Sequence, residues 1–236
     1  MIPTSERESK KPLLTRELLG VGVFVGSYMA AAVVRAAYAR NVEFLFYIAV
    51  MLLLILAVIL IHRRVALSQG LLWALAAWGG LHMAGGLVPL PESWPIDGDI
   101  RVLYSWWIVP KQAGGAAGGW LKYDQLTHAY GFGVTTWLCW QGLRGALTGY
   151  RRAGREVEPT IGLMVITAAA GAGFGALNEI VEFVATRITV TNVGGYENTG
   201  WDLVYNAVGA LIAVGLIYAF RRRGAVSTTE CTEVRG

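Results

Sequence analysis

The sequence predicts an all-α, polytopic membrane protein built as a bundle of six transmembrane helices. Of its 236 residues, 55% are hydrophobic and only 15% are charged, whereas about a quarter of the residues in a soluble domain are charged. The 30 glycines and 9 tryptophans are typical of transmembrane helix contacts and of interfacial aromatic belts. The net charge of +4 is small, so we expect membrane lipid and no nucleic acid as a partner.

Six apolar segments are long enough to cross a hydrocarbon core of about 30 Å, which takes about 20 helical residues. In chain order they are Leu18–Tyr38, Val42–Ile61, Gly70–Leu90, Tyr123–Leu143, Thr160–Thr186 and Gly200–Phe220. The second segment is so uniformly apolar that we expect it to face lipid. Glycines four residues apart, Gly22/Gly26 in the first segment and Gly171/Gly175 in the fifth, are expected to let helices approach closely.

The basic residues predict the orientation. Most of the 20 lysines and arginines lie on the side of the membrane that holds both termini, so the positive-inside rule places both termini in the cytoplasm, at the plasma (inner) membrane. Residues 1–17 are then a cytoplasmic N-terminal segment, 18–220 the six-span domain and 221–236 a disordered cytoplasmic tail. The outer loop 91–122, with its prolines, glycines and tryptophans, is expected to lie at the outer membrane surface.

Polar side chains gather near the outer ends of the last four segments. They are His82, Asp124, His128, Asn178, Glu179, Glu182, Asp202 and Asn206. Three pairs are spaced four residues apart and the two glutamates three apart, so each pair lies on one helix face. Ionisable side chains inside a membrane are costly unless they are paired or line a polar cavity. We therefore expect a shared pocket near the outer surface.

Carboxylate and imidazole side chains, spaced three or four residues apart on facing helices, are how helix bundles hold metal ions. The expected ligands are His82, Asp124, His128, Glu179, Glu182 and Asp202. Imidazole with hard oxygen ligands favours zinc, iron or manganese. Cys139 and Cys231 are expected at different depths, so we predict neither a disulfide nor a thiolate site. Structural explanations stay open: Asp124 and Asp202 lie in first helical turns, where acidic residues are favoured anyway, and His82 could be a core histidine.

Four motifs carry a resemblance to a known family. "LHMAGGLVPLP", "YDQLTHAYGFG", "NEIVEFV" and "WDLVYNAVGA" together resemble the YjdF-like family of uncharacterised bacterial and archaeal membrane proteins. More distantly the chain is similar to VanZ-like proteins, which share an Asp/His span, a Glu span and a final Asp…Asn-x-x-Gly span. The matching positions are His82, Tyr123, Asp124, His128, Glu179, Glu182, Trp201, Asp202, Asn206 and Gly209. The VanZ-like resemblance, which adds Asn206 and Gly209, implies an envelope-facing role, and the YjdF-like resemblance implies no established activity.

The resemblance adds Tyr123 and Trp201 to the expected pocket. It covers the chain from the third segment onward, and the first two segments match only as hydrophobic helices. Asn178 stands where many YjdF-like relatives have Tyr, so the resemblance assigns this position no role.

Three functions are compatible with such a pocket. The first is an enzyme at the outer leaflet acting on a lipid or lipid-linked envelope precursor. In it Glu179 or Glu182 is the base or a ligand, and His128, beside Asp124, is the proton partner or a ligand. The second is a non-catalytic protein whose polar cluster locks the bundle or binds a partner. The third is a proton-coupled transporter, disfavoured because the cytoplasmic halves of the segments carry almost no polar groups.

Overall fold

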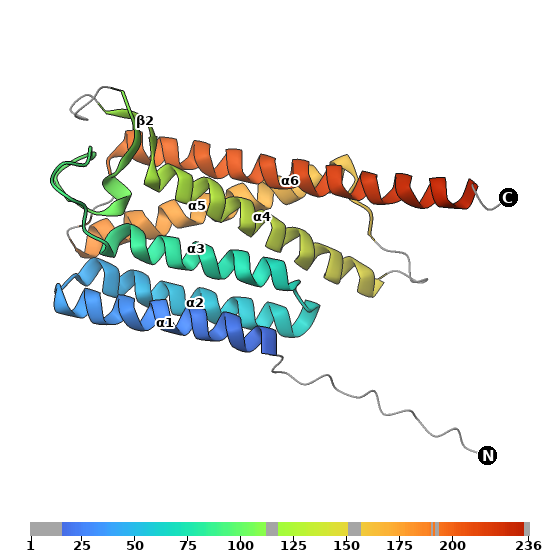
Figure 1. The fold of residues 1–236 in the computed structure, drawn as a ribbon, viewed down its shortest axis with the longest axis horizontal. Coiled ribbons are helices and arrows are strands. Elements are labelled where there is room, and N and C mark those ends of the chain that lie inside the picture. The colour runs from blue at the N-terminus through green and yellow to red at the C-terminus, as the bar shows by residue number, and fades with distance from the viewer. Residues whose placement is uncertain (1–15, 112–117, 151–156, 190, 192–193, 234–236) are drawn as a thin grey trace, which may run out of the picture.

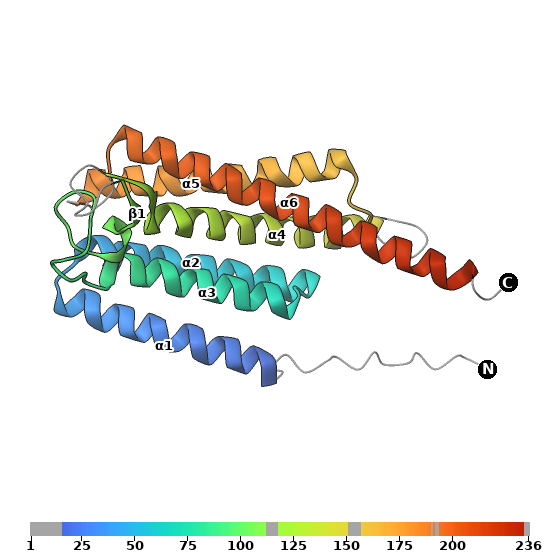
Figure 2. The same cartoon turned by 45° about the horizontal axis from the view of Figure 1, so that its top comes forward.

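The computed structural model describes residues 16–111, 118–150, 157–189, 191 and 194–233. In these residues six α-helices lie side by side as one bundle (Figure 1). They are α1 (Arg16–Tyr38), α2 (Val42–Val65), α3 (Gln69–Leu87), α4 (Tyr123–Tyr150), α5 (Ile161–Ile188) and α6 (Tyr196–Glu233). The start of α1 and the end of α6 lie at one end, the terminal end. The α1–α2, α3–α4 and α5–α6 connections lie at the other, the loop end (Figures 1 and 2).

The predicted all-helical class is confirmed, with one addition at the loop end. There the chain forms a 3₁₀ turn, η1 (Leu103–Ser105), and two antiparallel strands, β1 (Trp107–Pro110) and β2 (Gly119–Lys122). We expected this stretch to lie at the membrane surface and did not predict strands. Each strand has only four residues, too few for a clear period in the sequence, and a hairpin this short needs support from the rest of the fold. The support comes partly from the start of α4, where the Tyr123 amide donates to the Trp106 carbonyl at 2.9 Å.

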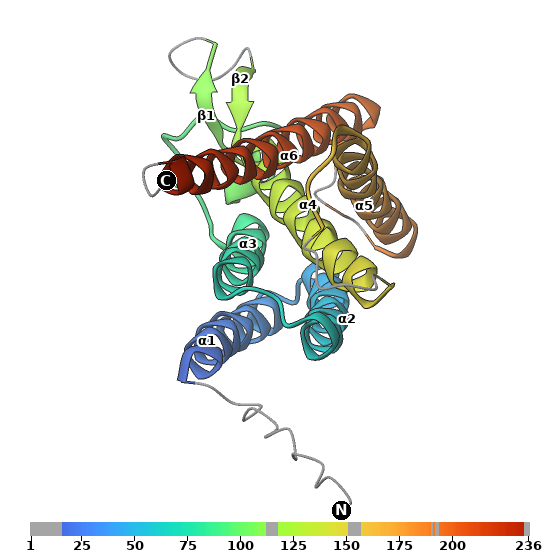
Figure 3. The same cartoon turned by 90° about the vertical axis from the view of Figure 1, so that its right-hand side faces the viewer.

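Four of the described helices are long and apolar enough to cross a membrane. They are Leu18–Tyr38 of α1, all of α2, all of α5 and Tyr196–Phe220 of α6. In α3 and α4, glycine, tryptophan and polar residues interrupt the aliphatic run. Both helices nevertheless lie within the bundle, and α4 contacts α2, α3, α5 and α6 (Figure 3). This is a multi-pass membrane protein by composition, and the prediction of six spans stays a prediction.

The last helix is longer than we expected. We predicted a span ending at Phe220 and a disordered tail over 221–236, whereas α6 continues as helix to Glu233. The sequence contains no proline after Pro159, so none interrupts α6. Residues 234–236 of the predicted tail, and 1–15 of the predicted N-terminal segment, lie outside the described residues.

The loop-end half of α2 buries one of its faces in the bundle, whereas the prediction had the helix facing lipid. Phe44, Tyr47, Ile48 and Met51 recur at helical spacing and are buried in a core cluster. In the terminal half of the same helix, leucines and isoleucines are exposed, as predicted. An all-apolar helix gives no contrast by which the sequence could distinguish its buried face.

The glycine pairs behave differently from one another. A Cβ placed on Gly171 or Gly175 of α5 would collide with side chains of α4 and α6, so these glycines do allow close helix contact. Gly22 and Gly26 of α1 have no described atom near the position of a Cβ, so the prediction is wrong for that pair.

Candidate functional site

Every acidic, basic or histidine residue that is buried within the described residues lies near the loop end. These residues are Glu43, Lys122, His128, Glu179 and Asp202. Two further carboxylates accompany them: Asp124, whose side chain is 15% exposed, and the partly buried Glu182. We call Asp124, His128, Glu179, Glu182 and Asp202 the acidic cluster. The structure thus brings together residues that the sequence predicted to share a pocket.

His128 on α4 is at the centre of the acidic cluster. Its Nδ1 lies 2.9 Å from Oδ1 of Asn206 on α6, and its Nε2 lies 3.6 Å from Oδ1 of Asp124 one turn earlier. An amide oxygen only accepts hydrogen bonds, so this contact selects the form with a proton on Nδ1. Nε2 then faces Asp124 and is available to hold a proton or a metal ion.

Several buried polar atoms of the site have no hydrogen-bond partner among the described residues. They are both carboxylate oxygens of Glu179, Oδ1 of Asp202 and Nδ2 of Asn206. The nearest cationic group recorded for Glu179 is His128 Nδ1, at 3.7 Å, which is beyond hydrogen-bonding range. A buried carboxylate without a partner is costly, so such atoms call for a proton, a water molecule or a cation.

Two sets of potential metal ligands overlap at His128. One set is Asp124, His128 and Asp202, and the other is His128, Glu179 and Glu182. Within each set, one ligand atom from every residue lies within 4.8 Å of the others. Five of the six predicted ligands therefore belong to one or the other set, each set is close enough to share an ion, and the five come from three helices, α4, α5 and α6.

His82, the sixth predicted ligand, is not in either set. Its Nδ1 lies 2.5 Å from the Tyr104 hydroxyl of η1, and the same hydroxyl donates to the His82 carbonyl at 3.0 Å. Burial raises the pKa of the Tyr104 phenol well above its ordinary value, so it stays neutral and able to donate. His82 therefore anchors the outer loop to α3 at the edge of the site.

Of the other predicted pocket residues, Asn178 contacts the acidic cluster, Tyr123 contacts α3 and Trp201 is exposed. Asn178 donates to Oε1 of Glu182 at 2.7 Å and so orients that carboxylate. Tyr123 donates to the Leu81 carbonyl at 3.0 Å, which ties α4 to α3. Trp201 is 48% exposed and is not among the residues that line the cavity beside the acidic cluster, so its place in a pocket stays a prediction. Its neighbour Asp202 is fully buried, and consecutive residues of a helix point about 100° apart.

The sequence analysis did not predict the residues that connect the outer loop to the acidic cluster. Lys122, at the end of β2, lies 3.2 Å from Asp97 Oδ2 and 3.7 Å from Asp124 Oδ2, and it donates to Oδ1 of Asn198. A lysine only donates, so the Asn198 amide must turn its NH₂ away, toward Oδ2 of Asp202 at 2.5 Å. This chain of contacts holds one oxygen of Asp202 and leaves the other facing the cluster. In the sequence, the only indication of these contacts was a lysine, Lys122, two residues before Asp124.

A small cavity of about 40 Å³ adjoins the acidic cluster. It is lined by Glu43, Phe44, Tyr47, His82, Tyr104, Asp124, Glu182 and Asn198. The contribution of α2 was not predicted, because the second segment offered only a hydrophobic match. The volume is enough for about one to three water molecules, or for an ion with a water ligand.

Comparisons with known proteins identify a family. The model of a family described as predicted membrane proteins, DUF2238, matches residues 21–223, which include most of each of the six helices. The YjdF-like resemblance is consistent with this family, whereas no comparison supports the VanZ-like one. No curated protein and no solved structure matches the chain. The chain belongs to the DUF2238 family of predicted membrane proteins.

Proposed function

We propose that this protein holds a divalent metal ion in the acidic cluster and uses it as an enzyme on a lipid or lipid-linked envelope substrate. The observation that carries the proposal is the set of buried carboxylate oxygens around His128 that have no hydrogen-bond partner among the described residues. A cluster that served only to lock the helices together would be expected to pair its own polar atoms.

The charges of the cluster favour a cation. Asp124, Glu179, Glu182 and Asp202 face one imidazole and one lysine, and Lys122 is shared with Asp97. A divalent ion would offset this negative charge, and imidazole with carboxylates suits zinc, iron or manganese. The hydrogen bond from His128 to Asn206 is the outer contact that orients metal-binding histidines in proteins.

The residues around the 40 Å³ cavity have roles in this proposal. When bound, the ion would polarise a carbonyl or phosphoryl oxygen, or make a water molecule more acidic. Glu182 lines the cavity and is oriented by Asn178, so it is the candidate base. The cavity is too small for a whole lipid headgroup, so only the reacting group of the substrate would enter it.

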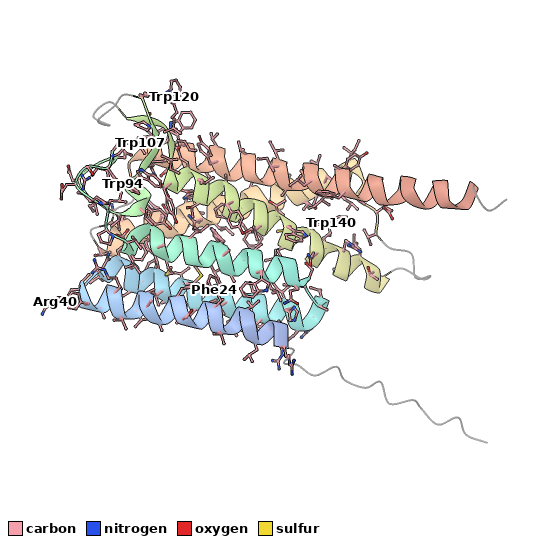
Figure 4. The ribbon with its side chains drawn as sticks, in the orientation of Figure 1. Phe24, Arg40, Trp94, Trp107, Trp120 and Trp140 are labelled. Carbon is pink, nitrogen blue, oxygen red and sulfur yellow. The ribbon has the colours of Figure 1, made fainter. Side chains whose placement is uncertain are left out.

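The proposed setting is the outer face of a plasma (inner) membrane, with six spans and both termini cytoplasmic. The distribution of basic residues supports this orientation. Trp94, Trp107 and Trp120 all lie at the loop end (Figure 4), and Trp120 is 72% exposed. Exposed tryptophan suits the headgroup region of a bilayer, where it would meet a lipid substrate.

A non-catalytic metal site or partner-binding site is the alternative, and a transporter ranks below both. A transporter needs ionisable groups along a path through the membrane. The buried ionisable residues of the described chain lie toward one end only.

The test is elemental analysis of purified protein, with Glu179→Gln and His128→Ala beside the wild type. Glu92→Gln is the matched control, because the Glu92 side chain is 93% exposed and belongs to neither set of potential ligands. We expect near-stoichiometric metal in the wild type and the control, and loss of metal in both cluster variants. Wild-type protein that folds and carries no metal would overturn the metal site.

The enzymatic part is tested separately by incubating the metal-loaded protein with membrane lipid extract and following lipid species by mass spectrometry. We expect a lipid to be consumed by the wild type and by Glu92→Gln, and not by Glu182→Gln. Metal binding with no lipid consumed would favour the non-catalytic alternative.

A further inference from the structure

A second, much larger cavity lies between α4 and α6, with the α2–α3 connection at one end. Its volume is about 950 Å³, at the upper end of the range for ligand clefts. The walls are mainly apolar and include Val134, Trp137 and Trp140 of α4 and Ile212 and Leu216 of α6. We call it the α4–α6 groove. It is separate from the acidic cluster, whose residues do not line it.

The groove runs along the helices and is open at the side. Its α4 residues recur every three or four positions from Leu126 to Thr148, a length of about 33 Å at 1.5 Å per residue. This is close to the hydrocarbon thickness of a bilayer, about 30 Å. Ile212 and Leu216 are more than half exposed, so in a membrane the groove would be filled by something apolar.

Most of the polar side chains lie at the terminal end of the groove. Ser68, Gln141 and Arg144 line it there, and Gln141 is fixed by two hydrogen bonds with Ser68, at 2.7 and 2.8 Å. Arg63 and Arg64, both exposed, immediately precede Val65, another lining residue. The groove is thus apolar along its length and cationic at one end, which is the complement of an anionic amphiphile.

We propose that the α4–α6 groove binds an anionic phospholipid from the leaflet at the terminal end. The phosphate lies at Arg144 and the acyl chains run along Trp140, Trp137 and Val134, a distance of about 15 Å or one leaflet. A second copy of the chain fits less well. A two-fold axis along the membrane normal would bring Arg144 against its own image, and like charges across an interface are unfavourable.

The test measures tryptophan quenching by brominated lipids in phosphatidylcholine vesicles. The signal of Trp137 and Trp140 is the difference between the wild type and the Trp137→Phe/Trp140→Phe variant. We expect brominated phosphatidylglycerol to quench this signal several-fold more than brominated phosphatidylcholine at the same mole fraction. Arg144→Gln should remove the preference and Arg144→Lys should restore it. Ala213→Phe, which fills the groove, should reduce quenching by both lipids.

Arg16→Gln is the matched control, since Arg16 is an exposed arginine at the same end of the bundle on α1. It should keep the preference. Native mass spectrometry of the wild type provides a check that needs no variant, with phosphatidylglycerol expected to be retained over phosphatidylcholine. Equal quenching by the two lipids would overturn the proposal. So would a disulfide dimer formed in membranes through Ala213→Cys in a chain lacking Cys139 and Cys231.

Discussion

The two ring nitrogens of His128 face different partners, and this difference defines what the residue can do. Nδ1 meets the amide oxygen of Asn206, while Nε2 is turned toward Asp124. Asn206 itself is 1% exposed, and its NH₂ group makes no hydrogen bond within 3.5 Å among the described residues. A buried NH₂ group without a hydrogen bond destabilises the fold. We infer that Asn206 is nevertheless present because its amide oxygen orients the imidazole of His128.

Replacing Asn206 should therefore change metal binding without touching a ligand. Asn206→Leu removes the acceptor for Nδ1–H, and we expect the affinity for metal to fall by about 10–100-fold. Asn206→Asp keeps an acceptor oxygen at the same place and should bind within a few-fold of the wild type. Competition with a chromogenic chelator measures both, and equal losses in the two variants would contradict this role.

Tyr104 gives a prediction about alkaline pH. Burial raises its pKa, so the folded protein favours the neutral phenol. This stabilisation is complete below the ordinary pKa of about 10 and is lost as the pH rises toward the higher folded value. Tyr104→Phe has nothing to ionise, so its melting temperature should fall less steeply above about pH 10 than that of the wild type.

At neutral pH the same variant should be less stable by about 1 kcal/mol, because it loses the hydrogen bonds to His82. Tyr196→Phe serves as the control, since Tyr196 is 95% exposed. Thermal melts in detergent from neutral to alkaline pH test both statements. Parallel curves for wild type and Tyr104→Phe would show that the buried phenol does not control alkaline stability.

Among the elements, α4 and α6 form the most extensive helix pair in the bundle. Gly209 of α6 makes this possible, because a Cβ there would collide with the carbonyl oxygen of Ala129 on α4. The backbones are thus in direct contact one residue after His128 on α4 and three residues after Asn206 on α6. Close contact at this point keeps the two residues within hydrogen-bonding distance.

Gly209→Ala should push α4 and α6 apart, at a cost of about 1–3 kcal/mol in the free energy of unfolding. Gly215→Ala in the same helix is the matched control, because nothing lies near the position of its Cβ. It should be neutral or stabilising by up to about 1 kcal/mol, since alanine is the better helix former. Thermal unfolding in detergent compares them, and similar effects for both would rule out the close contact.

Some elements could be predicted from the sequence and others could not, for physical reasons. Long apolar runs locate the helices, and pairs spaced four apart locate the acidic cluster. The rotation of a helix about its axis depends on its neighbours, however, so the sequence alone did not show that Trp201 is 48% exposed. The same applies to Tyr47 of α2, whose uniformly apolar run gave no sign of the face that lines the cavity. The contacts of Lys122 depend on a turn of the outer loop that no periodic pattern specifies.

On the scale of the whole molecule, charge is distributed unevenly along the bundle axis. The buried carboxylates lie toward the loop end. Exposed arginines lie at both ends, Arg16, Arg63 and Arg64 at the terminal end and Arg35, Arg40 and Arg187 at the loop end, but most lysines and arginines of the full sequence fall on the side of the termini. The positive-inside rule relates this asymmetry to a single orientation in the membrane.

That orientation can be tested with single cysteines in a chain lacking Cys139 and Cys231. Asp99→Cys lies in the exposed outer loop and Arg63→Cys at the opposite end. In intact cells a membrane-impermeant maleimide should label Asp99→Cys alone, and after permeabilisation it should label both. Labelling of Arg63→Cys in intact cells would mean that the chain is inverted.

The contacts of Lys122 also bear on how the protein is made. Asp97 and Lys122 belong to the outer loop and Asn198 to the start of the last helix, so the chain of contacts that holds Asp202 joins segments that are synthesised far apart in time. In the proposed orientation, the outer loop crosses the membrane before α6 is inserted. The site is then completed only when the last span is in place, with its cavity at the outer face. An ion that binds there would be drawn from the outer compartment and not from the cytoplasmic metal pool.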